Sequence, residues 1–184
     1  FHLLSQQVLD WSKVVVTLAD ERWVDADHGD SNEKLVRENL LINEAHTAAF
    51  IPLKNAAMDA AEGEIQTESD IEQMGQFTVV ILGMGDDGHT ASLFPGASNL
   101  EEMEKICVVA EHPETGQKRV SITFPVINNA KRVSFLVAGA AKEPVFKEIL
   151  EKGTSEALPY PASMVDPENG VLEWYLDKAA APEL

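Results

Sequence analysis

The chain has 184 residues, 45% of them hydrophobic, which is enough for one well-buried core. Its 31 acidic and 14 basic residues give a formal net charge of -17, and such a surface repels nucleic acids and anionic membranes. One cysteine, Cys107, allows no intrachain disulfide and fits a reducing cytosol. No apolar run reaches the length of a membrane span. We therefore expect a cytoplasmic protein that binds a small molecule and has neither a nucleic-acid nor a membrane partner.

The first third of the chain is predicted to contain a helix, a buried strand and a second helix. Apolar side chains at helical spacing in residues 2–11 indicate the first helix, and the β-branched run at 14–18 indicates a buried strand. Asp30 or Ser31 can cap a second helix that ends near residue 43. Residues 45–74 show a weak pattern, and a short helix is expected only at 67–74.

The stretch at residues 77–95 is the most informative part of the sequence. An apolar strand at 79–82 leads into a loop that contains three glycines, two aspartates and His89. A short helix, ended by Pro95, is expected to follow. In α/β proteins such a loop lies at the carboxyl end of a parallel strand, where ligands bind. Gly85 and Gly88 allow the backbone to approach a substrate closely.

The rest of the chain alternates between predicted strands and helices. Strands are expected at 106–110, 119–124 and 132–138, with a turn or short helix at 125–130 and a helix within 139–150. A final strand at 160–165, a turn and a closing helix at 171–180 complete the prediction. This order favours the α/β class, with a mostly parallel sheet covered by helices on both faces.

The glycine loop permits two interpretations that we consider weaker than catalysis. Gly83, Gly85 and Gly88 match the dinucleotide-binding pattern G-x-G-x-x-G, but two carboxylates occupy the turn where a pyrophosphate would lie. Asp86, Asp87 and His89 are suitable metal ligands, yet three groups this close in sequence rarely meet one ion without further ligands. We therefore expect neither a cofactor nor a metal.

His89 is the best candidate for chemistry. A neutral imidazole can take a proton from water near neutral pH, and a neighbouring aspartate can orient the ring and stabilise its charged form. Asp86 is better explained as a residue that caps or fixes the loop. Three cations, Arg22, Arg119 and Lys142, are expected at sheet ends, where they could bind an anionic substrate. The sequence alone also allows each of them to be an ordinary surface charge.

Several motifs together resemble one protein family. They are ADERWV at residues 19–24, SN at 31–32, GMGDDGHTASLFP at 83–95, the strand at 119–123, GAAK at 139–142 and YPAS at 160–163. In this order they resemble the soluble bacterial 6-phosphogluconolactonases. The related glucosamine-6-phosphate deaminases share the Gly-x-Asp-Gly-His core, but they are expected to continue with Ile-Ala-Phe-Asn-Glu, where this chain has Thr-Ala-Ser-Leu-Phe.

The resemblance implies a three-layer α/β/α doubly wound fold of the sugar-phosphate isomerase/deaminase type, with one domain over residues 1–184. It implies hydrolysis of 6-phospho-D-glucono-1,5-lactone to 6-phosphogluconate in the pentose phosphate pathway, without metal or cofactor. His89 would act as general base and Asp87 would support it, while Arg22, Arg119 and Lys142 would hold the phosphate or the developing oxyanion.

One expected element has no match in the sequence. Family members are expected to begin with a strand and a Ser-Gly-Gly-Ser-Thr-Pro loop that binds phosphate, and we therefore expect the domain to be incomplete at its N-terminus. The alternatives are a deaminase or isomerase acting on an amino sugar phosphate, and a sugar-phosphate-binding remnant without catalysis.

Overall fold

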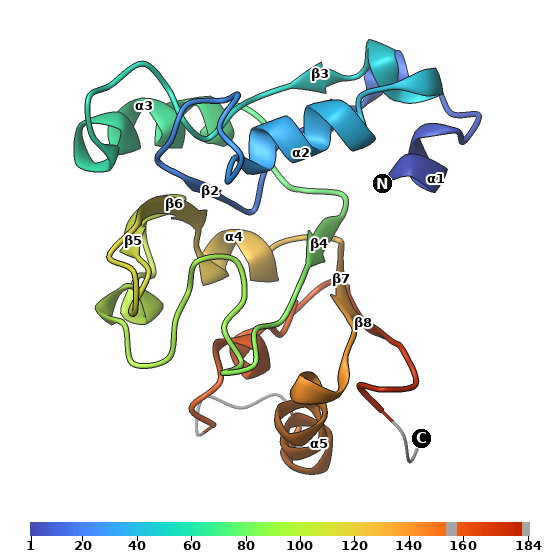
Figure 1. Cartoon of the computed structure of the whole chain (residues 1–184), viewed down its shortest axis with the longest axis vertical. Helices are drawn as coiled ribbons and strands as arrows, with labels where there is room; N and C mark the ends of the chain where they lie inside the picture. Colours follow the sequence, from blue (N-terminus) through green and yellow to red (C-terminus); the bar gives the residue numbers. More distant parts are fainter. Residues whose placement is uncertain (154–157, 182–184) are drawn as a thin grey trace.

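The computed structural model describes residues 1–153 and 158–181. In this part of the chain, eight strands form three small sheets, with helices packed against them (Figure 1). The α-helices are α1 (His2–Ser5), α2 (Asn32–Asn39), α3 (Ala60–Glu72), α4 (Phe124–Asn128) and α5 (Glu143–Lys152). The expected α/β class, with parallel sheets flanked by helices, is confirmed.

The sheet that carries the glycine loop is parallel. Its strands are β4 (Val80–Leu82), β7 (Arg132–Val137) and β8 (Val171–Leu176), in the order β4-β7-β8. Val133 and Phe135 of β7 are completely buried, because α5 and the flanking strands cover the centre of this sheet. The loop with His89 leaves the carboxyl end of β4, as the sequence predicts.

The other strands form a parallel pair and an antiparallel sheet. β1 (Val15–Val16) pairs with β3 (Ala49–Phe50) in parallel. β2 (Asp20–Arg22), β6 (Lys118–Ile122) and β5 (Cys107–Glu111) form an antiparallel sheet in the order β2-β6-β5. The connection between β5 and β6 is too short for the crossover that parallel strands need, and Gly116 turns it with φ = 69°. Arg22 is the last residue of β2.

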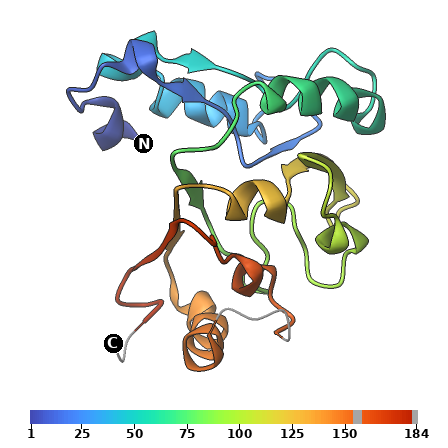
Figure 2. The same ribbon diagram turned by 180° about the vertical axis from the view of Figure 1, so that it is seen from behind.

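Helices α2 and α3 lie at one end of the molecule and α5 lies at the other, with α4 between them (Figure 1). Figures 1 and 2 both show α2, α3 and β3 grouped at one end and α5 at the other, with β4 and β7 between them. One apolar cluster gathers around Leu53 and Ile71 and another around Phe135 and Ile127, and Phe77 packs against both. Among the described residues, no helix is both long enough and apolar enough to cross a membrane.

Three predictions for the first half of the chain need correction. The helix expected at 2–11 is only α1, followed by a 3-10 turn at Trp11–Lys13, because Leu3, Val8 and Leu9 are exposed and leave no buried face. The second helix is capped by Ser31, the second of the two candidates, and ends at Asn39.

The helix expected at 67–74 begins earlier, at Ala60, because Asp59 caps it by accepting a hydrogen bond from the N–H of Glu62. Gly63 lies inside α3. A Cβ at this glycine would lie 2.1 Å from Cη2 of Trp23, so its absence makes room for the indole ring.

Two predictions near the C-terminus are reversed. The strand expected at 160–165 is a 3-10 helix, Pro161–Met164, whose Ala162 N–H donates to the carbonyl of Gly88. The helix expected at 171–180 contains strand β8 instead. Trp174 of β8 stacks on Phe135 of β7 with ring centroids 4.1 Å apart, so tertiary packing decides the conformation of this segment.

The short helix expected after His89 does not form. Ala91 has a positive φ of 49°, and Thr90 pairs with Leu93 through an isolated bridge. The Thr90 hydroxyl donates to the carbonyl of Gly83 at 2.8 Å and closes the loop on itself. The segment after His89 is therefore a compact turn, and it has no helical N-terminus to offer to an anion.

Candidate active site

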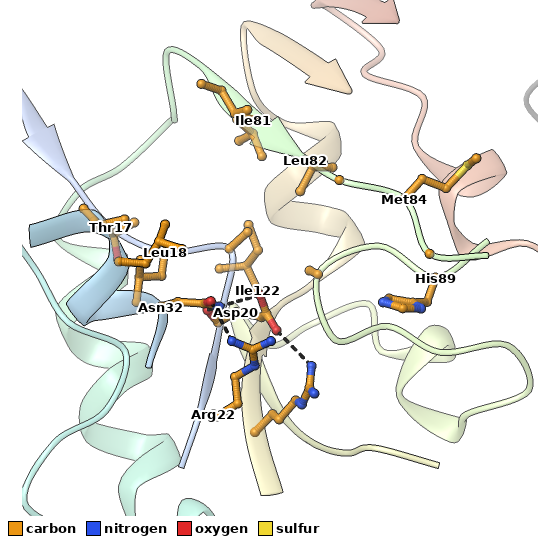
Figure 3. Close-up of a pocket in the computed structure, with 18 of the residues that line it drawn as sticks. Thr17, Leu18, Asp20, Arg22, Asn32, Ile81, Leu82, Met84, His89 and Ile122 are labelled. Atoms are coloured by element: carbon orange, nitrogen blue, oxygen red, sulfur yellow. Dashed lines mark hydrogen bonds and ion pairs between the residues drawn. The ribbon is translucent and has the colours of Figure 1, made fainter. Parts of the chain in front are cut away.

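A cleft of about 610 Å³ opens between β4 with its loop on one side and β2, β6 and α2 on the other (Figure 3). Five of the seven predicted site residues line it: Gly85, His89, Arg22, Arg119 and Lys142. The other two, Asp87 and Gly88, belong to the same loop but lie outside the lining. Residues separated by more than a hundred positions in the sequence thus face one cavity.

Asp87 holds the ring of His89. Its Oδ1 lies 2.7 Å from Nδ1 of His89 and also accepts the backbone N–H of His89 at 3.0 Å. Burial raises the pKa of Asp87, but these hydrogen bonds lower it by a larger amount. The pKa of Asp87 is therefore below its ordinary value. Asp87 is therefore ionised at neutral pH and can only accept. Nδ1 of the neutral ring must then carry the proton, which leaves the lone pair on Nε2.

Gly85 makes this arrangement possible. A Cβ on Gly85 would lie 2.1 Å from Nδ1 of His89 and 2.6 Å from Oδ1 of Asp87, so no other residue fits without displacing the pair. Gly85 also donates its N–H to the carbonyl of His89 at 2.8 Å, which folds the loop back on itself. Gly88 has φ = 81°, and a Cβ there would lie 2.7 Å from the ring of Tyr160.

Arg22 and Arg119 face each other across the antiparallel β2-β6 pair, where they are register partners. Like charges placed opposite each other destabilise a sheet, so this pair suits an anion that binds between the two side chains. Nη1 of Arg22 donates to the carbonyl of Asp30 and to Oδ1 of Asn32, at 2.8 and 2.9 Å. These two contacts hold its guanidinium at the edge of the cleft (Figure 3).

Arg119 is only 8% exposed and has weak polar contacts. Its Nη1 lies 3.6 Å from Oδ2 of Asp20 and 3.4 Å from Oγ of Ser92, and its Nη2 lies 3.3 Å from Oε1 of Gln117. Its Nε is buried without a partner among the described residues. Burial, followed by repulsion from Arg22, lowers the pKa of Arg119, although arginine stays protonated in proteins. The group therefore keeps donors available for an anion.

Lys142 enters the cleft from the turn that follows β7. Its ammonium group pairs with Oδ1 of Asp86, the carboxylate that the sequence analysis assigned to the loop rather than to catalysis. The two neighbouring aspartates thus have different partners, because Asp86 meets Lys142 and Asp87 meets His89. Among the described residues, no cluster of three or more His, Cys, Asp or Glu could hold a metal ion.

Sequence reasoning missed the buried carboxylate of Glu21, which is 1% exposed. It accepts hydrogen bonds from the backbone N–H groups of Arg22, Asn32 and Glu33, each at 2.8 Å, and from the hydroxyl of Ser31 at 3.0 Å. Glu21 therefore accepts hydrogen bonds from the free N–H groups at the N-terminus of α2 and holds this helix against β2. Its signal was the motif ADERWV, in which only the arginine was considered for the site.

Asp20, Asn32 and Ser92 were also missed as supports of the cations. Ser92 Oγ donates to Oδ2 of Asp20 at 2.6 Å, and Nδ2 of Asn32 donates to the carbonyl of Asp20 at 2.8 Å. Asp20 and Ser92 are far apart in the sequence, so no local pattern connects them. Asn32 lies in the SN motif, which was a signal that local reasoning did not use.

The chain matches the family model described as glucosamine-6-phosphate isomerases/6-phosphogluconolactonase over residues 1–174. It is 40% identical to the 6-phosphogluconolactonase of Haemophilus influenzae, over 94% of this chain and 75% of that protein. It is 39% identical to that of Synechocystis, over 100% of this chain and 79% of the relative. The crystal structure of a 6-phosphogluconolactonase from Shewanella baltica superposes with a TM-score of 0.86 at 36% identity, covering 96% of this chain and 77% of that one. The chain therefore belongs to the glucosamine-6-phosphate isomerase/6-phosphogluconolactonase family.

Proposed function

We propose that this protein hydrolyses 6-phospho-D-glucono-1,5-lactone to 6-phosphogluconate, a step of the pentose phosphate pathway. The observation that carries the proposal is the Asp87–His89 pair, whose ring lines the same cleft as Arg22, Arg119 and Lys142. A base beside a group of cations suits an ester with a phosphate. Relatives that carry the lactonase name, at 40% and 39% identity, support the same assignment.

In this proposal His89 is the general base. Nε2 takes a proton from a water molecule, and the water oxygen attacks the lactone carbonyl carbon. The resulting imidazolium is stabilised by the carboxylate of Asp87 at 2.7 Å. The tetrahedral intermediate then expels the ring oxygen, which receives the proton from His89 and becomes the hydroxyl group of the open acid. Substrate and water supply every atom of the product, so we propose a reaction without a cofactor.

The three cations would bind the phosphate and the negative charge that develops on the carbonyl oxygen. Such charges matter most in a site that excludes water, and Arg119 is the most buried of the three. The net charge of -17 makes a local cationic cleft necessary for an anionic substrate. The acidic surface disfavours nucleic-acid and membrane partners, and the single buried Cys107 favours a cytoplasmic location. We also propose that the chain forms one lactonase-like domain.

The test is hydrolysis of freshly generated 6-phosphogluconolactone, corrected for spontaneous opening of the ring. We compare the unmodified protein with His89→Ala and with His46→Ala, an exposed histidine remote from the loop. A rate above background that disappears only with His89→Ala supports the proposal. Activity that survives His89→Ala refutes the assignment of the base.

A parallel assay measures ammonia release from glucosamine 6-phosphate. It addresses the second activity in the family description, because the same loop could serve an amino sugar phosphate. Ammonia release without lactone hydrolysis would replace the proposed function by a deaminase. Binding of 6-phosphogluconate without either reaction would instead identify a binding protein.

A further inference from the structure

The ring of Phe94 lies close to both His89, the candidate base, and Arg119. It is 3% exposed and belongs to the turn that follows His89, but it does not line the cleft. Its ring centroid lies 4.8 Å from that of His89, with the two planes inclined at 46°. The Cζ atom of Arg119 lies 5.7 Å from the same centroid, within the range of a cation–π interaction.

The polar contacts of the two neighbours leave part of their orientation unexplained. Asp87 holds His89 through one ring nitrogen, which fixes the direction of Nδ1 but leaves rotation about that hydrogen bond. Within residues 1–153 and 158–181, Arg119 has polar contacts only at 3.3 Å or longer, and its Nε has no partner. In both cases the ring of Phe94 lies close enough to add a constraint, because van der Waals contact restricts a tilt that one hydrogen bond permits.

The ring of Phe94 is itself held from its outer side. The imidazole of His112 meets it edge to face at 5.3 Å. Nδ1 of His112 accepts the backbone N–H groups of Glu114 and Thr115, both at 3.3 Å, so this histidine belongs to the fixed turn between β5 and β6. Phe94 thus joins the β4 loop to the sheet that carries Arg119.

We propose that Phe94 is a positioning residue for the proposed hydrolysis: its ring sets the orientation of His89 relative to Arg119. The expected changes in kcat and KM rest on the proposed function. The orientation of His89 and Arg119 by Phe94 does not depend on it. Neither Phe94 nor His112 lines the cleft, so neither is expected to touch the substrate. A side chain without a ring would fill most of the volume, yet it would release both functional groups.

The test compares Phe94→Leu with Phe146→Leu. Phe146 is a matched control, because it is 5% exposed, lies on α5 and has an aromatic neighbour, Trp174, at 5.3 Å. We expect Phe94→Leu to lower kcat at least about tenfold and to raise KM about threefold, since small displacements of reacting groups are costly. Phe146→Leu should keep both parameters within about twofold, because Phe146 does not line the cleft.

A second measurement works without any turnover. Diethylpyrocarbonate labelling of His89 and phenylglyoxal labelling of Arg119, located by peptide mass spectrometry, report how firmly each group is held. Exposed His28 serves as the internal reference, and the completely buried thiol of Cys107 reports whether the fold is intact. We expect both labelling rates to rise at least about threefold in Phe94→Leu, since packing constraints are lost, while Cys107 stays protected.

The outcomes separate the two proposals. Faster labelling of both groups in Phe94→Leu, with Cys107 protected, supports the positioning role even if the unmodified protein does not hydrolyse the lactone. Unchanged labelling, or equal changes in Phe146→Leu, overturns it even if the protein is a lactonase. If Cys107 reacts in Phe94→Leu, the same measurements are made on Phe94→Met, which fills more of the volume without an aromatic ring.

Discussion

Oδ1 of Asp87 accepts two hydrogen bonds from the same residue, one from the ring of His89 at 2.7 Å and one from its backbone N–H at 3.0 Å. The same carboxylate oxygen of Asp87 therefore fixes both the imidazole ring and the backbone N–H of His89. Asp86, the adjacent residue, carries the same functional group but pairs with Lys142. The chain thus contains two neighbouring carboxylates that can be compared directly.

The first prediction concerns these two aspartates. Asp87→Asn should lower kcat about 100- to 10,000-fold, because the amide neither enforces the proton on Nδ1 nor stabilises the imidazolium. Asp86→Asn should change KM more than kcat, because it alters the charge beside Lys142. Steady-state kinetics with the lactone measure both effects. Equal losses of kcat in the two variants would contradict the assignment of Asp87.

The second prediction is the pH dependence of stability. Because the pKa of Asp87 is lowered in the folded state, its ionised form stabilises the fold above its unfolded pKa, and this contribution disappears as the pH falls through the folded value. The difference in unfolding free energy between the unmodified protein and Asp87→Asn should shrink as the pH falls below about 4.

Urea unfolding at a series of pH values measures this difference. Other carboxylates with lowered pKa values, such as Asp177, are present in both proteins and cancel in the comparison. A difference that persisted undiminished below about pH 3 would mean that the carboxylate of Asp87 is not responsible.

The third prediction concerns Gly85. Gly85→Ala should remove most of the activity, because the added Cβ would lie 2.1 Å from Nδ1 of His89 and must displace the ring. The global fold should survive, since the change lies in a loop beside the open cleft. Gly29→Ala is the control, because nothing lies within 4 Å of its added Cβ. Circular dichroism and the lactone assay distinguish loss of activity from loss of structure, and an active Gly85→Ala protein would refute the role of this geometry.

The fourth prediction concerns the buried carboxylate of Glu21. Glu21→Gln should destabilise the protein by about 2–4 kcal/mol, because an amide nitrogen at Oε2 could accept neither the backbone N–H of Glu33 nor the hydroxyl of Ser31. Glu38→Gln, at an exposed position on the same helix, should change stability by less than about 0.5 kcal/mol. Chemical denaturation measures both variants. A small effect at Glu21 would show that water can replace the carboxylate at the start of α2.

Local patterns predicted those elements that local interactions determine. The strands at 106–110, 119–124 and 132–138 and the helix within 139–150 all exist within a few residues of the predicted bounds. The prediction of a helix at 171–180 was wrong, because the conformation of residues 171–176 depends on pairing with β7 and on the stacking of Trp174 on Phe135. A short apolar run fits a strand or a helix equally well until its tertiary partner is known.

The same distinction applies to the candidate site. His89 was predicted to be important because its glycine loop is a local signal. The role of the cations came from the family resemblance, since their places near strand ends also allowed ordinary surface charges. The sequence could not tell which aspartate faces His89, because that depends on backbone angles such as φ = 81° at Gly88. The opposition of Arg22 and Arg119 follows from the β2-β6 register, which no local pattern reveals.

The space left by Gly85 has a consequence for protein engineering. A designer who copied only the side chains of Asp87 and His89 onto another scaffold would not reproduce their contact, because the imidazole lies where a neighbouring β-carbon would otherwise be. The transferable unit is a backbone segment with an empty position, and a computational search for similar sites should specify that missing atom along with the two functional groups.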